Sequence, residues 1–508
     1  MIRLFAELFG HYRLASGQKI AQFFHFMTPT PVSAHPDPES ASASQNGSKR
    51  WRVGTLTYGT AGLVALFCWL LWGDFAWNMK ERAVQPMSQL LFKQFKASDL
   101  VLGLMVTSLP AALGMLIGPI ISVRSDNHRG RWGRRIPYLL IPTPIAALAM
   151  VGMGYTIEIA DFLRGILGAD APDPIACRLI VFAGLWTFFE IFTVIANSVF
   201  VGLINDVVPQ AVIGRFFALF RIVGLGAGII FNSFLIGHAE ENFKLLFIGL
   251  GLLYGVGFSV MCFMVKEGDY PPPAPKTGGA FTSRVAEPIR AYVQECSAHR
   301  FYLWIFLAAM LGNAAFLPIN SFDVPYIRSI GMTMERYGEL RSLTYAISIC
   351  LALFIGWFAD KFHPIRVGMF ALAVYAVIAL WAGFIARDIT SFSVAYVAHG
   401  VISGIFFTGT ASLFPRLFPR AKFAQFASAA GIILALGFIG VPPVVGQFLD
   451  LTGHAYHYTF VIGGVLAATG VVAFLILYRQ FLALGGSERY TPPAQDGGVC
   501  LERSGQGL

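Results

Sequence analysis

Two ionisable side chains stand inside long apolar runs and are the first candidates for chemistry. Asp74 lies in the run 55–79, and Glu190 lies near the middle of the run 176–204. A carboxyl group is costly to bury in an apolar medium, so such residues are functional candidates by default. Burial favours the neutral acid, which can take up a proton and later release it. A satisfied hydrogen bond between helices is the alternative explanation for each.

Polar residues at helical spacing extend this set in two places. One stripe begins at Asp74 and predicts that its helix continues to about Pro86 with one wet face; its members are Asp74, Asn78, Glu81 and Gln85. A second stripe, interrupted by Pro318 and Pro325, comprises Asn313, Asn320 and Asp323. Broken helices with polar faces are expected where a solute crosses a membrane.

These patterns define the expected roles. We expect Glu190 to carry a proton, with Asp323 as a further candidate, and Asp74 to accept hydrogen bonds from solute hydroxyls as well as to take part in proton coupling. Arg221 needs a carboxylate or carbonyl partner, for which Glu190 is one candidate. The predicted solute contacts are Asp74, Asn78, Glu190, Asn197, Arg221, Asn313 and Asn320.

The composition shows what must position these residues. Of 508 residues, 56% are hydrophobic and only 13% are charged, whereas soluble proteins carry about 25% charge. The chain therefore cannot cover a water-facing surface, and a soluble enzyme is excluded. The net charge of +9 comes from cations in short loops, which is typical of topology signals rather than of nucleic-acid binding. The six cysteines lack paired spacing, and neither a metal site nor a cofactor is indicated.

Apolar runs of about 20 residues predict membrane-spanning helices, because a chain in lipid must satisfy its own backbone. The twelve candidate spans are 55–79, 98–123, 136–157, 176–204, 214–237, 245–265, 301–325, 338–359, 367–386, 393–415, 424–448 and 458–481. The predicted fold is an all-α membrane protein with two six-helix bundles.

A proline-rich segment divides the spans six and six. We expect a tail over 1–52, bundles over 53–265 and 301–482, a linker over 266–300 and a second tail over 483–508. One set of alternate segments holds more than twice as many Lys and Arg residues as the other. That bias places both termini and the linker in the cytoplasm, and the protein in the cell membrane.

Two short motifs recur in the same order in each half, which indicates a duplicated unit. The first motif follows the second span of each half and contains an Asp with nearby cations. An Asp and clustered cations at helix ends can form a latch that closes the cytoplasmic side, although these Arg residues would also serve to fix the topology alone. The candidate gate residues are Asp126, Arg131, Arg134, Arg135, Asp360, Lys361 and Arg366.

At this point the chain resembles the major facilitator superfamily, whose signature loop is similar to the stretch from Gly356 to Arg366. The longer text Ser125-Asp126…Arg131-Trp132-Gly133-Arg134-Arg135-Ile136-Pro137-Tyr138 resembles the branch of sucrose transporters and glycoside–pentoside–hexuronide symporters. Gly73-Asp74-Phe75-Ala76 is also similar to a stretch of that branch, and the resemblance implies that Asp74 contacts sugar. Residues 98–121 have only Asp99 as an acidic group, which argues against the sodium site of the melibiose type.

The leading hypothesis is a secondary transporter that moves a sugar or similar polar solute by alternating access with a proton, and not an enzyme. The expected partners are the solute, a proton and the lipid bilayer, with the monomer as the working unit. Two alternatives stay open: a proton-driven exporter of amphipathic compounds, and a non-transporting receptor or assembly factor on the same fold.

Overall fold

The computed structural model describes residues 50–270, 296, 299–419 and 422–493. Most of the expected tail 1–52, most of the linker 266–300 and the end of the second tail therefore lie outside the described residues. A short hairpin of β1 (Trp51–Val53) and β2 (Leu56–Tyr58) precedes the first helix. The sequence predicted a helix from residue 55, but the hairpin delays its start to Thr60.

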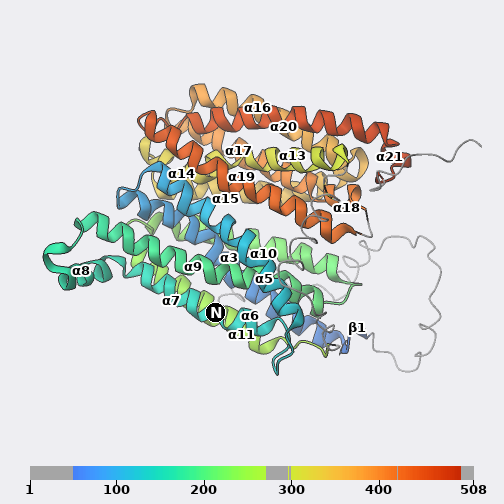
Figure 1. Cartoon of the computed structure of the whole chain (residues 1–508), viewed down its shortest axis with the longest axis horizontal. Helices are drawn as coiled ribbons and strands as arrows, with labels where there is room; N and C mark the ends of the chain where they lie inside the picture. The colour runs from blue at the N-terminus through green and yellow to red at the C-terminus, as the bar shows by residue number, and fades with distance from the viewer. Residues whose placement is uncertain (1–49, 271–295, 297–298, 420–421, 494–508) are drawn as a thin grey trace, which may run out of the picture. The chain divides into compact units, whose positions relative to one another are not determined.

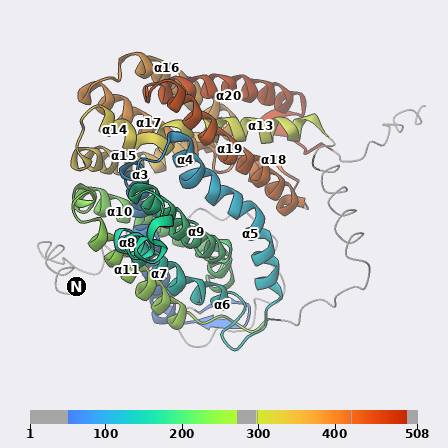
Figure 2. The ribbon, with the colours of Figure 1, turned by 60° about the vertical axis from the view of Figure 1, so that its left-hand side comes forward.

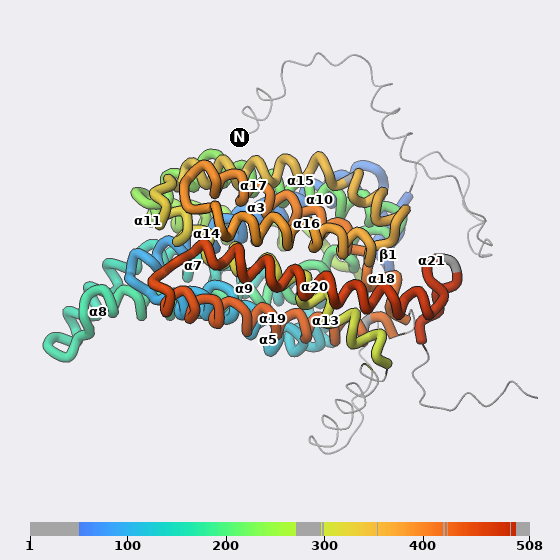
Figure 3. Tube along the Cα trace, turned by 90° about the horizontal axis from the view of Figure 1, so that it is seen from above, coloured from blue at the N-terminus to red at the C-terminus, as the bar shows by residue number. Residues whose placement is uncertain are grey.

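The N-terminal half (residues 50–270) contains six helical spans, some of them built from consecutive helices. They are α3 (Thr60–Gln94); α4 (Asp99–Gly103) with η2 (Leu104–Ser108) and α5 (Leu109–Asn127); α6 (Ile136–Leu140) with α7 (Pro142–Gly154); α9 (Pro174–Val207); α10 (Ile213–Phe234); and α11 (Phe243–Met264). The short helices α8 (Thr156–Leu167), η3 (Gly168–Asp170) and η4 (Ile236–His238) lie between spans. Figure 3 shows α8 projecting beyond the neighbouring helices.

The C-terminal half (residues 299–493) contains the other six. They are α13 (Arg300–Ala314) with α14 (Leu317–Ser329); α15 (Met334–Phe362); α16 (Pro364–Ile385); α17 (Ile389–Thr410) with α18 (Leu413–Leu417); α19 (Phe423–Leu451); and α20 (Tyr458–Ala483), followed by α21 (Gly486–Arg489). Figure 1 shows these helices on one side and those of the N-terminal half on the other.

Within the described residues, eleven spans are long and apolar enough to cross a membrane, and the bent pair Met334–Ala352 and Phe354–Phe362 supplies a twelfth. The predicted all-α fold with twelve membrane helices is therefore confirmed. The first helix differs most from its predicted span, because it continues past Pro86 to Gln94. Its polar extension is stable as a helix because it packs against α14 and α10 rather than lipid.

The two ends of the bundle are named here by their loops. The outer end carries the loops at residues 95–98, 235–242, 330–333, 386–388 and 452–457, and the inner end carries those at 128–135 and 208–212 and residues 418–419 after α18. The names follow the orientation that the cation count predicts.

Small residues bring the two halves into backbone contact near the outer end. A Cβ atom added to Gly446 in α19 would lie 2.2 Å from the Asp99 carbonyl oxygen, and one on Gly338 in α15 would lie 2.1 Å from that of Asn232. Gly103 approaches the Pro442 carbonyl in the same way. Such close approach is the usual role of glycine between membrane helices, and it places α4 beside α19 (Figure 2).

We predict that Gly446→Val separates α4 from α19, because its side chain has no room beside the Asp99 backbone. Overpacking of this kind costs about 1–3 kcal/mol. The thermal midpoint of the purified protein should fall, and cysteines placed at the outer interface should become accessible to thiol reagents. Gly440→Val in the same helix is the control, since a Cβ there meets nothing within 4 Å. Equal effects of both variants would contradict the close contact.

The orientation can be tested with two exposed loop residues, Gln210 at the inner end and Glu241 at the outer end. In a cysteine-free background, we expect a membrane-impermeant thiol reagent to label Glu241→Cys in intact cells. Gln210→Cys should be labelled only in inverted vesicles, because the cation bias places it in the cytoplasm. The reverse pattern would overturn the predicted topology.

Candidate functional site

A cavity of about 450 Å³ lies between the two halves. Its lining comes from α3, η2 and α10 of the N-terminal half and from α14, α15, α17 and α19 of the C-terminal half. The side chains with the strongest hydrogen-bonding capacity in this lining are Arg82, Arg221, Asn320, Arg341, Tyr345 and His399. Of the predicted solute contacts, Asn320 and Arg221 therefore lie at the cavity.

A break in the helix beside the cavity exposes Asn320. Between Pro318 and Pro325 the backbone leaves the helical conformation at Phe322, where φ is −130°. The Gln89 side chain of α3 repairs the break, because its amide donates to the Asn320 carbonyl at 3.1 Å and accepts from the Val324 N–H at 3.3 Å. A broken membrane helix needs such a partner for its freed backbone groups.

Asp323 forms a buried ion pair at the wall of the cavity. Its Oδ2 atom accepts hydrogen bonds from the hydroxyls of Tyr337 at 2.6 Å and Tyr396 at 3.1 Å, and the Arg341 guanidinium lies 3.7 Å away. With three donors directed at it and an exposed fraction of 1%, Asp323 neutralises Arg341 rather than facing the solute space.

His399 connects the cavity to the interior of the C-terminal half. Its Nε2 lies 3.2 Å from Asn320 Oδ1, and its Nδ1 lies 2.8 Å from the Tyr375 hydroxyl. A neutral imidazole satisfies both contacts, because Nε2–H donates to the amide oxygen while Nδ1 accepts from the tyrosine. The histidine thereby fixes which face Asn320 presents to a solute.

Three arginines line the cavity and meet around neutral hydroxyls. The Tyr345 hydroxyl accepts from Arg82 at 3.4 Å and from Arg341 at 3.2 Å. Arg221 of α10 donates to Thr408 of α17 at 3.3 Å and so links the two halves. The carboxylate partner expected for Arg221 is not found within the described residues; Thr408 takes that place.

Asp74 lies within the contact between α3 and α10 and not in the cavity lining. It is 0% exposed, and its Oδ1 accepts from Asn78 at 2.6 Å. Its Oδ2 is buried with no hydrogen-bond partner among the described residues. Asn78 packs against Gly224 of α10, where an added Cβ would lie 2.9 Å from the amide oxygen.

Glu190 lies in a second cluster of charged groups, inside the N-terminal half. Lys80 is 1% exposed, its ammonium lies 3.8 Å from the Trp77 ring centre, and it donates to Glu81 at 3.0 Å. The charges of Glu81 and Lys80 both act on Glu190. Glu190 is 8% exposed, while the Glu81 side chain is 57% exposed, so the cluster runs from a buried acid to an open one.

The two remaining predicted solute contacts lie apart from the cavity lining. Asn313 donates to the Ala309 carbonyl of its own helix at 2.8 Å, and Asn197 is exposed on α9. Sequence reasoning missed Lys80, Arg82 and Arg341, because cations at the ends of predicted spans are typical of topology signals.

The predicted gate residues of the N-terminal half form an ion-pair network at the inner end. Arg135 contacts Asp126 at 2.5 Å and Asp206 at 3.1 Å, and Arg134 contacts Asp206 at 2.6 Å. Glu267 adds a cap, since its carboxylate accepts from the backbone N–H groups of residues 134–136 at 2.8–3.1 Å. Arg131 is exposed in the same loop.

The C-terminal half has its own inner network. Asp360 pairs with Arg416 at 2.5 Å, Arg366 donates to the Tyr478 hydroxyl at 2.7 Å, and the Lys361 ammonium lies 4.8 Å from the Trp357 ring centre. Burial and the neighbouring Arg416 and Arg366 lower the pKa of His363 to about 4. The neutral ring can therefore accept the Ile365 N–H and cap α16.

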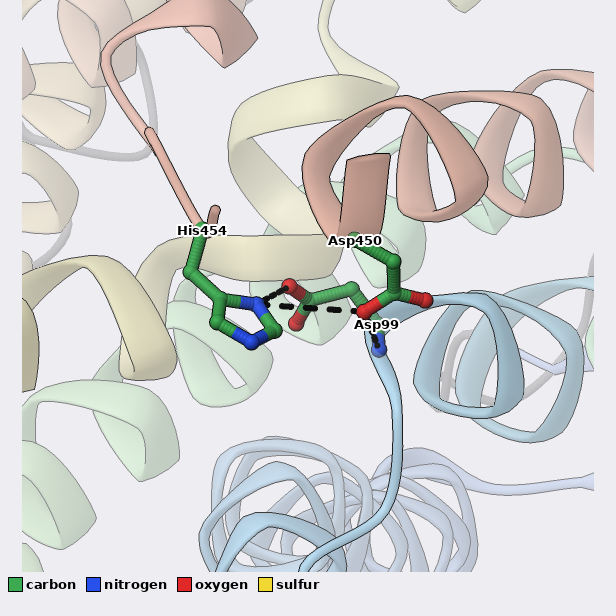
Figure 4. A group of neighbouring side chains, drawn as sticks. All are labelled: Asp99, Asp450 and His454. Atoms are coloured by element: carbon green, nitrogen blue, oxygen red, sulfur yellow. Dashed lines mark hydrogen bonds and ion pairs between the residues drawn. The ribbon is translucent and has the colours of Figure 1, made fainter. Parts of the chain in front are cut away.

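A charged cluster at the outer end joins the halves (Figure 4). Asp450 of α19 caps α4, since its two oxygens accept from the N–H groups of Asp99 at 2.8 Å and Leu100 at 2.9 Å. Asp99 also contacts His454 at 2.7 Å and Lys93 at 2.7 Å. These donors already satisfy the carboxylates. The cluster therefore holds α4 against α19 and is not a cation site.

The two inner networks predict different costs for losing an acid. Asp206 is only 14% exposed and faces two arginines, whereas Asp360 is 74% exposed and pairs with one. Asp206→Asn should cost about 3 kcal/mol, near the lower end for a broken buried pair, and Asp360→Asn about 1 kcal/mol or less. Thermal unfolding of both purified variants measures this, and an equal loss would contradict the difference in burial.

Comparison with known proteins shows which family and which solved structures this chain is similar to. A family model described as the Major Facilitator Superfamily matches residues 319–496. A bacterial homolog of the human lysosomal transporter Spinster, in an inward-facing and unoccupied conformation, has a TM-score of 0.58 at 15% identity over 85% of this chain and 98% of its own. The nucleoside transporter NupG has a TM-score of 0.55 at 12% identity, covering 82% and 98%.

A D-xylose–proton symporter is similar in the same way, with a TM-score of 0.54 at 16% identity over 82% of this chain and 96% of its own. At these identities the solved structures share the fold with this chain. The family match in the C-terminal half and the common fold of twelve helices make the chain similar to the major facilitator superfamily.

Proposed function

We propose that the protein is a secondary transporter that carries a sugar or similar polar solute across the membrane by alternating access, coupled to a proton. The observation that supports this most directly is the polar cavity between the halves, lined by guanidinium, amide, imidazole and hydroxyl groups of both. A solute held there would contact both halves at once, as rocking of one half against the other requires.

The contacts between the halves support this cycle. Within the described residues, the ion pairs that join the two halves lie at the outer end, namely Asp99 with His454 and Glu240 with Arg328. The inner pairs of Asp126, Asp206 and Asp360 each lie within one half. This distribution suits a conformation closed at the outer end, in which the inner networks hold each half rigid.

The polar lining also bears on the alternatives. An exporter of amphipathic compounds needs a largely apolar cavity, whereas this lining presents three arginines, two amides and an imidazole. A receptor or assembly factor on this fold would not need a central polar cavity. The resemblance of residues 125–138 to sucrose transporters and their relatives agrees with a hydroxylated solute and belongs to the same proposal.

For the proton, we propose Glu190 as the carrier. A carboxyl group held in an apolar environment is stable when protonated, and the open Glu81 beside it offers a route for the proton to leave. Asp74 would stabilise α3 against α10 near the solute, and Asp323 would hold Arg341 in position.

The proposal predicts that Glu190→Gln abolishes uphill accumulation of solute but permits exchange of solute present on both sides. The amide keeps the shape of the acid yet cannot release a proton. Uptake of a panel of labelled sugars and their oxidised or phosphorylated derivatives into proteoliposomes, with and without a pH gradient, first finds the solute. Accumulation and exchange are then measured separately for each variant.

Glu158→Gln is the matched control, since Glu158 pairs with Lys244 at the exposed outer side of the N-terminal half. It should leave both modes close to those of the unmodified protein. Continued concentration of solute against a gradient by Glu190→Gln would exclude Glu190 as the carrier. Absence of uptake for the whole panel in both conditions would favour the non-transporting alternative.

A further inference from the structure

The charges around the central cavity do not balance within the protein. Arg341 is neutralised by Asp323 at 3.7 Å, and Lys80 by Glu81 at 3.0 Å. Arg82 and Arg221 have no ion-pair partner among the described residues and contact only the neutral hydroxyls of Tyr345 and Thr408. An unpaired guanidinium at this depth is costly, so it marks a place where charge compensation arrives from elsewhere.

The surroundings of Arg82 show that its compensation is incomplete. Its Nε–H is buried with no hydrogen-bond partner among the described residues. The Tyr345 hydroxyl that it contacts is shared with Arg341. Asp74 attracts Arg82 electrostatically, but the Asp74 carboxylate accepts its side-chain hydrogen bond from Asn78 on the same helix.

Arg221 completes the arrangement from α10. It is exposed to the cavity, and Arg82 and Arg221 repel one another electrostatically. Two like charges that face one cavity raise the free energy of the empty site, and a bound anion would remove that cost. The lining of the cavity contains three arginines and no carboxylate, which excludes a cationic solute on electrostatic grounds.

We propose that the cavity binds an organic anion, whose oxyanion group is held by Arg82 and Arg221 while its polar body contacts Asn320 across the cavity. Carboxylate and phosphate groups match guanidinium geometry and accept paired hydrogen bonds from it. This inference rests on the proposed function, since it names the charge of the solute that the transporter would carry.

The test measures thermal unfolding of the purified full-length protein against probe concentration. Gluconate is compared with the neutral sorbitol, and glycerol 3-phosphate with glycerol, at constant ionic strength set with sodium chloride. We expect a saturable rise of the midpoint with gluconate or glycerol 3-phosphate and none with the neutral partner. The responding pair tells a carboxylate site from a phosphate site.

Arg221→Gln should weaken the anion effect about tenfold or more, because it removes a charge-assisted hydrogen-bonding group. Arg215→Gln, on the same helix but outside the cavity lining, is the control and should respond as the unmodified protein does. Arg82→Gln should act like Arg221→Gln, and Arg82→Lys separates loss of charge from misfolding because it keeps the cation.

Three results would overturn the proposal: equal midpoint shifts with the neutral probes, no saturable shift with either anion, or equal responses of Arg221→Gln and Arg215→Gln. The two proposals fail separately. Anion binding in detergent without uptake into proteoliposomes would contradict transport alone. Uptake of a neutral sugar without anion binding would contradict the anion site alone.

Discussion

The cost of burying charge in an apolar interior governs the arrangement of this protein. Each ionised group in the spans has to be paired, shared or left facing a cavity. The Asp323 carboxylate is compensated by Tyr337, Tyr396 and Arg341. The Lys80 ammonium is compensated by the Trp77 ring and the Glu81 carboxylate. Arg82 and Arg221, which have no ion-pair partner among the described residues, both line the cavity between the halves. Function is therefore expected where neutralisation is incomplete.

The same constraint explains the inner networks of the two halves. In the N-terminal half the acid at the end of the fourth span, Asp206, pairs with Arg134 and Arg135 from the loop between the second and third spans. In the C-terminal half the charges are exchanged, because Arg416 stands at the corresponding place and meets Asp360. Each half therefore has an ion pair between the end of its fourth span and the region after its second span, with an acid on the fourth span of one half and a base on that of the other. The fold needs a pair of opposite charges at the inner end of each half, and it does not need a particular residue at either position.

Hydropathy was sufficient to predict the twelve spans and the division into halves, because lipid requires long apolar helices of any chain. Hydropathy did not predict the features that depend on packing between helices. The polar stripe predicts that the first helix continues to about Pro86, yet α3 extends to Gln94 because it packs against other helices. The partnership of Gln89 with Asn320 joins residues far apart in the chain, and no local spacing contains that information. Asp74 begins the stripe that predicts a wet face on its helix, yet it is 0% exposed. Its neighbour Asn78 packs against Gly224 of α10, a contact that local spacing does not predict.

The contacts between the halves are individually weak, which is compatible with opening of the outer end in the proposed transport cycle. The ion pair there between Glu240 and Arg328 involves side chains that are 45% and 39% exposed, and pairs of this kind contribute about 0–1 kcal/mol. The cap that Asp450 places on α4 is worth about 0.5–2 kcal/mol, and water could replace it once α19 moves away. The backbone contacts at Gly446 and Gly338 bury no charge, so separating them exposes only surface that lipid or water accepts. Many weak contacts together stabilise the closed outer end. If a solute or proton binds two conformations with free energies that differ by a few kcal/mol, that difference is enough to shift the equilibrium between them.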